Sequence, residues 1–457
     1  MVTLEALKSD QLTGQKRLSL SENLTEIPSD LFKLADSLEI LDLSNNQLST
    51  LPDSFSQLRN LKIVFFNNNQ FEEFPSVLAQ CPNLSMVSFK NNRIARIEDE
   101  HLSPTFRWLT LTNNCIERLP PTIGTLSKLQ KLMLAGNRLR TLPKELTNCK
   151  NLELIRLSAN QLSDFPTELL TLPRLTWLAY AGNPFCQQTA TVMDRNTGRS
   201  LPTIDWSELK VCESLGQGAS GVIYKGKWTP PHSTSPTPTP QDVAIKLFKG
   251  EMTSDGSPLD EMQACLAAGN HPNLVTLLGK LAGHPDKKAG LIFSILPSTY
   301  TPLGHPPSLD SCTRDTYPEG TVFSISQILT IAQGMASVVA HLHDRGMMHG
   351  DLYAHNILVS EKGDSILSDF GAASFYDTTP PHVGTVLEKL EVRALGCLLD
   401  DLLTRCIPIQ DSESAEAALF HRLHRLQLDC MSPVLVQRPR FRTICDGLTH
   451  MGLNPSA

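Results

Sequence analysis

The stretch LEILDLSNNQLSTLP, residues 38–52, decides the architecture of the first half of the chain. The same frame returns as LQKLMLAGNRLRTLP at 129–143. Apolar residues alternate with period two over a short strand in both copies, so one face of each strand is apolar. A single unit of this kind cannot bury its own apolar face, whereas a stack of units can. The first half is therefore predicted to be a repeat structure.

An asparagine marks each unit at a constant interval, except that the step from Asn92 to Asn114 is slightly shorter than the others. The eight positions are Asn23, Asn46, Asn69, Asn92, Asn114, Asn137, Asn160 and Asn183. Side chains of this type replace backbone hydrogen bonds at bends. The frame LxxLxLxxNxL, followed by a proline, resembles the leucine-rich repeat. The resemblance implies a curved α/β solenoid of about eight repeats over residues 1–190, followed by a linker over 191–207.

The third residue of each frame should point out of the concave side, opposite to the buried leucines. Read down the repeats, this position holds Ile40, Ile63, Met86, Trp108, Lys131, Leu154 and Trp177. Six of these seven residues are apolar, and contiguous exposed apolar area usually marks a partner site. We therefore expect a protein partner on the concave face, unless a terminal segment or the second domain covers it.

The overall composition bounds the possible functions. The chain has 457 residues and a net charge of −7, which argues against a general nucleic-acid binder. No apolar run approaches the roughly 20 residues of a membrane span, so none is expected. The 11 cysteines are scattered and never form CxxC, which fits reduced thiols in the cytoplasm better than a disulfide framework or a zinc site.

A glycine-rich sequence opens the second half. In LGQGASGVIYKGKW (215–228), Gly216, Gly218 and Gly221 follow an apolar, strand-like run. The residues after them also read as a strand, so the glycines are predicted to cap a hairpin, where backbone amides can approach phosphates. The loop PPHSTSPTPTPQ (230–241) cannot pack a core, and VAIK, ending at Lys246, follows it.

From here the sequence resembles a protein kinase, over roughly 205–450. Glu261 follows Lys246 in the helical-looking PLDEMQACLAAG (258–269). HGDLYAHNIL (349–358) resembles the catalytic loop, and SDFG (368–371) resembles the second metal-binding motif. EVRALGCLLDDLL (391–403) and QRPRF (437–441) resemble two late helical signatures. Six motifs in the expected order make a chance match negligible.

The resemblance implies a two-lobed α+β domain over 208–457, with an N-lobe at 208–296 and a C-lobe at 297–457. It also implies ATP and Mg²⁺ as cofactors. Asp351 would act as the catalytic base, Glu261 would position Lys246 on the phosphates, and Mg²⁺ would be held by Asn356 and Asp369. The nucleotide would be bound by Gly216, Gln217, Gly218, Gly221, Ile223, Ala244, Lys246, Ser294 and Leu296.

The second half also departs from the family pattern. Gly350 replaces an arginine that pairs with an activation-segment phosphate in many protein kinases. Tyr353 stands where serine/threonine kinases carry lysine, and His355 stands where tyrosine kinases carry arginine. Only 22 positions separate Asp369 from Glu391, which itself stands where the family usually has aspartate. Much of the peptide-docking segment is therefore predicted to be absent.

The same shortening removes the APE triplet. GT at 384–385 is predicted to be a remnant of the docking segment. Arg438, whose usual partner is the glutamate of APE, would need Glu388 or Glu391 instead.

Three functions remain open. The first is a cytoplasmic protein kinase, serine/threonine by default, whose repeats select a partner or substrate. The second is a pseudokinase scaffold that binds ATP with little transfer, which the damaged substrate platform favours. The third is a kinase-fold enzyme acting on a small molecule, since such enzymes also lack APE.

Overall fold

The structure is a computed structural model that describes residues 4–8, 12–186, 201–218, 220–230, 240–250, 252–377 and 381–453. The chain forms two compact units, one of Met1–Leu175 with Asn183–Phe185 and one of Thr176–Gly182 with Cys186–Ala457. Most of the predicted linker and the middle of the proline-rich loop lie outside the described residues. Each unit is described by itself.

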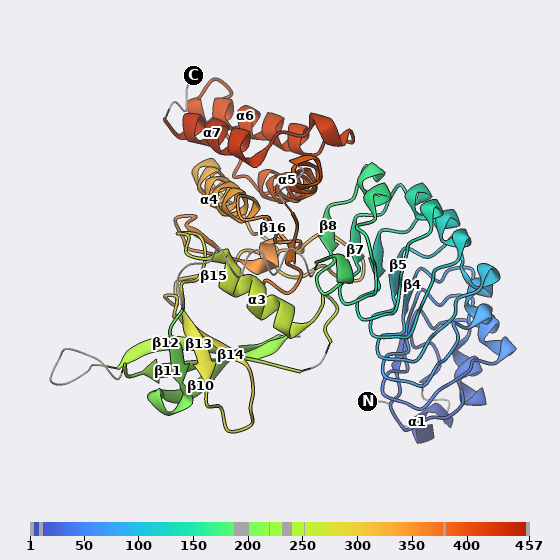
Figure 1. The fold of residues 1–457 in the computed structure, drawn as a ribbon. Coiled ribbons are helices and arrows are strands. Elements are labelled where there is room, and N and C mark those ends of the chain that lie inside the picture. The colour runs from blue at the N-terminus through green and yellow to red at the C-terminus, as the bar shows by residue number, and fades with distance from the viewer. Residues whose placement is uncertain are drawn as a thin grey trace. The chain divides into compact units, whose positions relative to one another are not determined.

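The repeats form a sheet of eight strands in sequence order, seen along the curved inner face in Figure 1. The strands are β1 Arg17–Ser19, β2 Ile40–Asp42, β3 Ile63–Phe65, β4 Met86–Ser88, β5 Trp108–Thr110, β6 Lys131–Met133, β7 Leu154–Arg156 and β8 Trp177–Ala179, after a short helix α1 Leu4–Lys8. Strands β1 to β7 pair in parallel, each displaced from the next by one repeat. The predicted leucine-rich solenoid is confirmed.

Short 3-10 helices, not α-helices, connect most of the strands. Asp53–Gln57 is typical: Pro52 precedes it in an extended conformation, and Phe55 is buried. The short repeat leaves too little chain for a full α-helix after its strand and bend, and short i→i+3 helices fit this space. The proline at this junction has a fixed φ and needs no hydrogen-bond acceptor, so it suits the entry to the helix.

A ladder of buried asparagines links successive repeats. The Nδ2 of Asn69 donates to the carbonyl oxygens of Leu43 (2.9 Å) and Phe66 (3.1 Å), and its Oδ1 accepts from the backbone N–H of Leu48 at 2.9 Å. The same pattern recurs from repeat to repeat, so each side chain satisfies main-chain groups at the bend that would otherwise be buried without partners. The predicted role is observed at Asn46, Asn69, Asn92, Asn114, Asn137, Asn160 and Asn183.

Asn23 is the exception, and its predicted role is wrong. Its side chain is exposed and its φ is 56°, the left-handed conformation that Asn45 adopts one position before the ladder in the next repeat. The first repeat is shorter between β1 and Pro28 than the second repeat is between β2 and Pro52. The shortening moves the asparagine out of the ladder and onto the turn, where asparagine tolerates a positive φ.

The third-position row is less exposed than the sequence suggests. Ile63, Met86 and Leu154 are buried, while Ile40, Trp108 and Lys131 keep partial exposure. Neighbouring parallel strands place these side chains directly beside one another, Ile63 next to Met86 for example, so each shields the next. Trp177 is also buried, and it packs on Tyr353 inside the second unit. Its ring faces away from the repeat's own leucines, as expected, but it is covered and not exposed, which matches the alternative in which the second domain covers this position.

The first lobe of the second unit is a six-stranded sheet with one helix. The strand order is β10-β11-β12-β14-β13-β9. The strands are β9 Thr203–Asp205, β10 Leu209–Gln217, β11 Gly221–Trp228, β12 Gln241–Phe248, β13 Leu277–Ala282 and β14 Gly290–Ser294, and the helix is α3 Pro258–Ala268. Residues 203–205, predicted as linker, instead form β9, which pairs in parallel with β13. Val243, Ile245 and Ile292 form the fully buried centre of the sheet.

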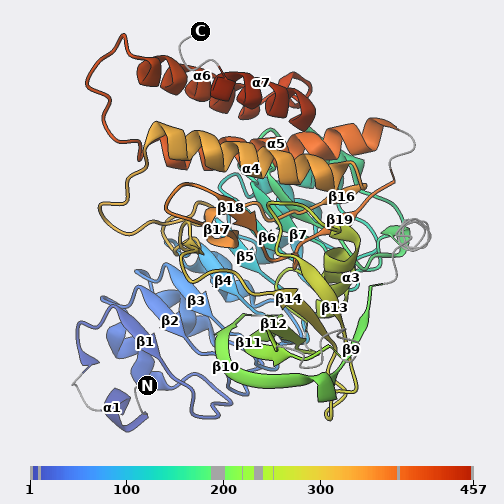
Figure 2. The same ribbon diagram turned by 90° about the vertical axis from the view of Figure 1, so that its left-hand side faces the viewer.

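The second lobe is mainly helical, and Figure 2 shows α4 and α5 running side by side beneath the pair α6 and α7. Its helices are α4 Ile325–His343, α5 Pro381–Leu403, α6 Ala415–Cys430 and α7 Phe441–Leu453. Its short strands are β15 Thr301–Pro302, β16 Met347–Met348, β17 Ile357–Val359, β18 Ser365–Leu367 and β19 Ser374–Phe375. The predicted two-lobed α+β kinase fold is confirmed.

Helix α4 is the apolar core of this lobe. It is long and apolar enough to cross a membrane by length and composition, but 56% of that window is buried inside the protein. Ile328, Ile331 and Val338 are completely buried. These properties are typical of a core helix of a globular domain, and such a helix is weak evidence for a membrane span.

Candidate active site

The glycine-rich turn is a tight antiparallel hairpin between β10 and β11, as the sequence predicted. The backbone N–H of Gly218 donates to the carbonyl of Gly221 at 2.9 Å. A Cβ on Gly221 would lie 2.6 Å from the carbonyl oxygen of Leu247, so this position excludes every larger residue. Gly216 and Gly218 have open space around them. Bare backbone at these two positions leaves room for a phosphate to approach.

The predicted nucleotide-binding residues lie on adjacent strands of the same sheet. Ile223 of β11 pairs with Lys246 of β12, and Ala244 pairs with Phe293 of β14. Ser294 ends β14, and Leu296 follows it in the segment that leads to the second lobe. Gln217 ends β10 at the turn. The set therefore extends across the sheet, from the glycine turn beside the Gly290 end of β14 to Ser294 at the opposite end of that strand. Its contact with a nucleotide stays a prediction.

Lys246 and Glu261 form an ion pair between β12 and α3. Glu261 is 1% exposed and lies in the first turn of α3, which begins at a proline preceded by the capping hydroxyl of Ser257. Burial alone would lower the pKa of Lys246, but the negative charges of Glu261 and Asp369 raise it above its ordinary value. Lys246 is therefore a fixed cation, as contact with phosphate oxygens requires.

Asp369 lies close to this pair. A Cβ on Gly371 would be 3.1 Å from an oxygen of Asp369 and 4.0 Å from one of Glu261. The φ of Asp369 is 60°, which non-glycine residues rarely adopt and which costs on the order of 1 kcal/mol or more. The Gly371 N–H, donating to Oδ1 of Asp369 at 3.0 Å, supports that conformation. Backbone strain of this kind is common at functional sites.

The catalytic loop joins Asp351 to Asn356. The Nδ2 of Asn356 donates to Oδ2 of Asp351 at 2.8 Å and to its carbonyl oxygen at 3.0 Å. The carbonyl of Asn356 in turn accepts from the N–H (2.9 Å) and the hydroxyl (2.8 Å) of Ser368, the residue before Asp369. These bonds hold the predicted base and both predicted metal ligands in one network.

The donor set fits Mg²⁺. Because the amide nitrogen of Asn356 faces Asp351, its oxygen is presented on the opposite side. Among the residues that the structure describes, no group of three or more His, Cys, Asp or Glu side chains could hold a metal by itself. Mg²⁺ commonly takes one or two protein carboxylates and completes its shell with waters and substrate phosphates. Asn356 and Asp369 would hold the ion only together with a nucleotide, which supplies the remaining oxygens.

Glu391 anchors the start of the catalytic loop from α5. Its carboxylate accepts from the backbone N–H groups of His349 (3.1 Å) and Gly350 (2.6 Å), and it lies 2.8 Å from Nε2 of His343. Burial alone would raise the pKa of Glu391, but these hydrogen bonds and the His343 ring lower it below its ordinary value of 4.5. Glu391, at the position where the family usually has aspartate, thus holds the backbone at the start of the catalytic loop.

Close packing of the backbone explains why position 350 is a glycine. Its φ is 74°, and a Cβ there would lie 2.6 Å from the carbonyl oxygen of Ala372 and 2.7 Å from that of Leu178. Any side chain, arginine included, would collide with two backbone segments. The missing arginine therefore reflects close packing around the loop.

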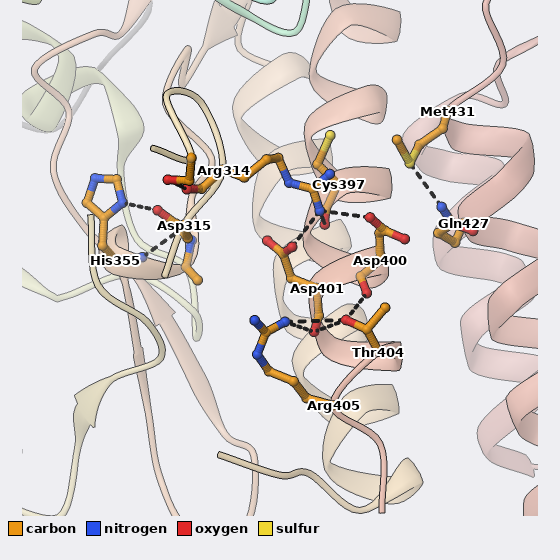
Figure 3. Close-up of polar contacts among 12 residues, drawn as sticks. Arg314, Asp315, His355, Cys397, Asp400, Asp401, Thr404, Arg405, Gln427 and Met431 are labelled. Carbon is orange, nitrogen blue, oxygen red and sulfur yellow. Dashed lines mark hydrogen bonds and ion pairs between the residues drawn. The ribbon is translucent and has the colours of Figure 1, made fainter. Parts of the chain in front are cut away.

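Figure 3 shows a second anchor, which the sequence did not reveal. Asp315 is 7% exposed, and its carboxylate accepts from the Ala354 N–H and from Nδ1 of His355, the latter at 2.7 Å. Burial would lower the pKa of His355, but its hydrogen bond to Asp315 and the nearby carboxylates raise it. Asp315 therefore holds the two residues that precede Asn356.

The segment that carries Asp315 is itself fixed to α5. The guanidinium of Arg314 pairs with Asp400 at 2.9 Å and with Asp401, and it donates to the carbonyl of Cys397 at 2.9 Å (Figure 3). Charge-assisted bonds to several acceptors restrict the position of the neighbouring residue. No motif marks RDTYPEG (314–320), so only the spatial proximity in the folded chain identifies Asp315.

The acceptor side differs from the sequence expectation. α5 already begins at Pro381, so GT at 384–385 lies within this helix and is not a remnant of a docking loop, contrary to the prediction. A Cβ on Gly384 would lie 2.8 Å from the ring of Tyr376. Helix α5 begins ahead of the helical signature at 391–403, so its first turns take up part of the span between β19 and Glu391. A peptide acceptor therefore finds little preformed backbone here within the described residues.

The late arginines are also rearranged. Glu388 pairs with Nε of Arg440 at 2.9 Å and accepts from the Phe441 N–H at 2.7 Å. The buried guanidinium of Arg438 donates to the carbonyl oxygens of Ser432 (2.9 Å) and Lys389 (3.0 Å). The prediction that Arg438 pairs with Glu388 or Glu391 is not confirmed by these contacts, because Glu388 bonds to Arg440 and Phe441 while Glu391 bonds to the start of the catalytic loop.

Comparison with known proteins identifies a family for each half of the chain. The family model for protein tyrosine and serine/threonine kinases matches residues 209–392, and the leucine-rich repeat model matches residues 16–71 and 127–185. Both resemblances drawn from the sequence are confirmed.

The relatives are protein kinases of several groups. The chain is 31% identical over 195 residues to cyclin-dependent kinase 11.1 of Caenorhabditis elegans, which is 42% of this chain and 25% of that protein. It is 32% identical over 196 residues to the mouse receptor tyrosine-protein kinase erbB-4, 42% and 14% respectively. It is 28% identical over 280 residues to the probable serine/threonine-protein kinase gdt4 of Dictyostelium discoideum, 53% and 16%. The chain spans a quarter or less of the length of each of these relatives.

Proposed function

We propose that this chain, in which leucine-rich repeats precede a protein kinase domain, transfers the γ-phosphoryl group of ATP to a protein hydroxyl, of serine or threonine. The repeats recruit the protein partner or substrate, and the phosphoryl transfer takes place in the cytoplasm. Kinase relatives with serine/threonine in their names support the acceptor class. The composition, with scattered cysteines outside any CxxC motif, supports the compartment.

The observation that carries the proposal is the assembled constellation of five side chains: Lys246 paired with Glu261 beside Asp369, and Asp351 bonded to Asn356. Phosphoryl transfer needs little covalent chemistry from the protein and depends on positioning and charge. Lys246 would bind phosphate oxygens, while Asp351 would orient the acceptor hydroxyl and take its proton. Bound Mg²⁺ would neutralise the charge that develops on the phosphates.

Recruitment by the repeats is supported by the partly exposed members of the third-position row. Lys131 lies over the ring of Trp108, its Nζ 4.0 Å from the ring centroid. Such a pair offers an aromatic surface and a positive charge together, a combination that interfaces favour. We propose that a protein partner contacts Ile40, Trp108 and Lys131 in preference to the buried residues of the row.

The test is incubation of the full chain with γ-labelled ATP and Mg²⁺, followed by phosphosite mapping on the chain itself and on proteins of a lysate. Label on serine or threonine that depends on Mg²⁺ supports the proposal. Label on tyrosine alone would overturn the acceptor class. Absence of label on any protein, with ATP consumed into a small-molecule product, would overturn the protein-kinase proposal.

A second candidate, a scaffold that binds ATP with little transfer, is favoured by one observation. α5 starts at Pro381, shortly after Asp369, so little chain remains to dock a peptide. Efficient transfer requires the acceptor to be held close to in-line geometry. ATP binding by calorimetry without measurable label or hydrolysis would decide for this function.

A further inference from the structure

The segment Thr176–Gly182 belongs to the same compact unit as the kinase domain, although the repeat pattern of the sequence runs on to Asn183. Trp177, Leu178, Ala179 and Tyr180 are each at most 2% exposed. Runs of buried residues are common in the repeat strands, but Trp177 occupies the repeat position at which Trp108 keeps partial exposure, so its burial needs a further contact. Contacts of this segment converge on the catalytic loop and on the residues after Asp369.

Trp177 makes the principal contact. Its indole ring stacks on the ring of Tyr353, with centroids 4.3 Å apart and planes 10° from parallel. Its Nε1 donates to the carbonyl oxygen of Leu352 at 3.2 Å. Both partners directly follow Asp351 in the chain. A tryptophan that gives a ring contact and a hydrogen bond to consecutive residues fixes the backbone between them, because both interactions are satisfied in only one loop conformation.

The backbone of the same segment makes two further contacts, next to the contact of Trp177. The carbonyl oxygen of Leu178 lies 2.7 Å from where a Cβ on Gly350 would be, so the residue before Asp351 is packed directly against the strand. The N–H of Tyr180 donates to the hydroxyl of Ser374 at 2.9 Å. Strand β8 thus contacts the residue before Asp351 in the catalytic loop. The residue that follows the strand bonds to Ser374, in the segment after Asp369.

The structure assigns to Trp177 the role of a positioning residue for the catalytic loop, acting through Tyr353 and Leu352 on Asp351. The substitutions that set this loop apart are explained together: glycine at 350 admits the strand backbone, and tyrosine at 353 supplies the ring on which Trp177 stacks. This inference rests on the proposed phosphoryl transfer for its kinetic consequence. Its structural consequence, order in the loop, does not depend on activity.

The experiment uses the full chain and two readouts. The first is steady-state phosphate release from ATP with Mg²⁺, which needs no protein acceptor and gives kcat and KM. The second is amide hydrogen exchange of the peptide that contains residues 349–358. The variants are Trp177→Leu, Tyr353→Leu, the double variant, and Trp177→Phe, which keeps a stacking ring but loses the donor. Phe420→Ala is the control, because it removes a ring that contacts His424 on α6.

Trp177→Leu is expected to lower kcat about 10-fold with KM for ATP unchanged, since a displaced base affects chemistry and not nucleotide binding. Trp177→Phe should recover part of this loss and also covers the case in which the leucine variant fails to fold. Because the two rings act as one contact, the double variant should also lose about 10-fold and not about 100-fold. Exchange in 349–358 should accelerate about 10-fold in the leucine variants and stay unchanged in Phe420→Ala.

The outcomes separate the two proposals. Unchanged exchange in 349–358 for Trp177→Leu overturns the positioning role, and so does an acceleration spread evenly over the whole second unit. Faster exchange confined to the loop in a protein that releases no phosphate supports the positioning role and overturns only the proposed function.

Discussion

The two sides of the candidate active site are built in different ways. The nucleotide side uses residues that family motifs identify directly: Lys246 pairs with Glu261, and Asp369 lies beside them. The acceptor side keeps Asp351 but surrounds it with contacts that no motif contains, from Asp315 to Ala354 and from Trp177 to Tyr353. The proposed binding of phosphates thus depends on motif residues, whereas the proposed placement of the acceptor depends on local replacements.

This difference indicates which residues of a kinase fold can be replaced while the catalytic loop is still held in place. A catalytic loop needs to be held, but several sets of side chains can hold it. In this chain a glutamate on α5, an aspartate in a loop and a tryptophan in a strand share that task. The predictions below separate the two sides, beginning with the largest expected effect.

Asp351→Asn is expected to abolish most transfer while ATP still binds. Loss of a general base typically costs about 10²- to 10⁴-fold in rate, and the variant leaves Lys246 and Glu261 untouched. Transfer is measured with γ-labelled ATP, and ATP binding by calorimetry. Equal labelling by wild type and variant would show that Asp351 is not the base.

Lys246→Met tests the nucleotide side. We expect transfer to fall about 10²- to 10³-fold, the range found when one charge-stabilising group is removed. Unlike Asp351→Asn, this variant should also weaken ATP binding, because it removes the cation that is proposed to contact the phosphates. A variant that binds ATP as tightly as wild type would break the proposed division between the two sides.

Asp315→Asn tests the acceptor side from a residue outside every motif. The amide keeps an acceptor for the Ala354 N–H but loses the charge beside His355, so we expect kcat to fall about 10-fold with KM for ATP unchanged. Asp315→Ala, which removes both contacts, should lose more. If instead KM for ATP rises with kcat unchanged, Asp315 belongs to the nucleotide side.

The sequence could predict whatever repeats locally or follows a motif in order. The solenoid, the hairpin at Gly218 and the helix that carries Glu261 all belong to this class. The role predicted for Asn23 is wrong because the first repeat is shorter after its strand, although the interval from Asn23 to Asn46 matches that of the next repeats.

Contacts between distant segments were out of reach of the sequence. Asp315 reaches Ala354 across 39 residues, and Trp177 reaches the catalytic loop across more than four times that distance along the chain. Neither residue type is unusual for its local context, since Trp177 occupies an ordinary repeat position. Only the folded chain shows that its ring is buried against the catalytic loop and not offered to a partner.

The last comparison concerns stability and not catalysis. Glu391→Gln and Arg440→Gln form a matched pair of variants, because each removes one partner of a contact made by a carboxylate of α5. Glu391 is fully buried and accepts two backbone bonds, so Glu391→Gln should lower the free energy of unfolding by about 2–3 kcal/mol. The Arg440 side chain is 57% exposed, so loss of its pair with Glu388 should cost less than about 1 kcal/mol.

Denaturant unfolding of both variants across pH checks this ranking and its origin. Because the folded-state pKa of Glu391 is lowered from 4.5, the charged form contributes stability above that pH, and this contribution is lost as the pH falls through the folded-state pKa. The gap between wild type and Glu391→Gln should therefore narrow in acid, whereas the gap for Arg440→Gln stays small throughout. A gap for Glu391→Gln that persists unchanged below the folded-state pKa would mean that packing, and not the buried charge, holds the start of the catalytic loop to α5.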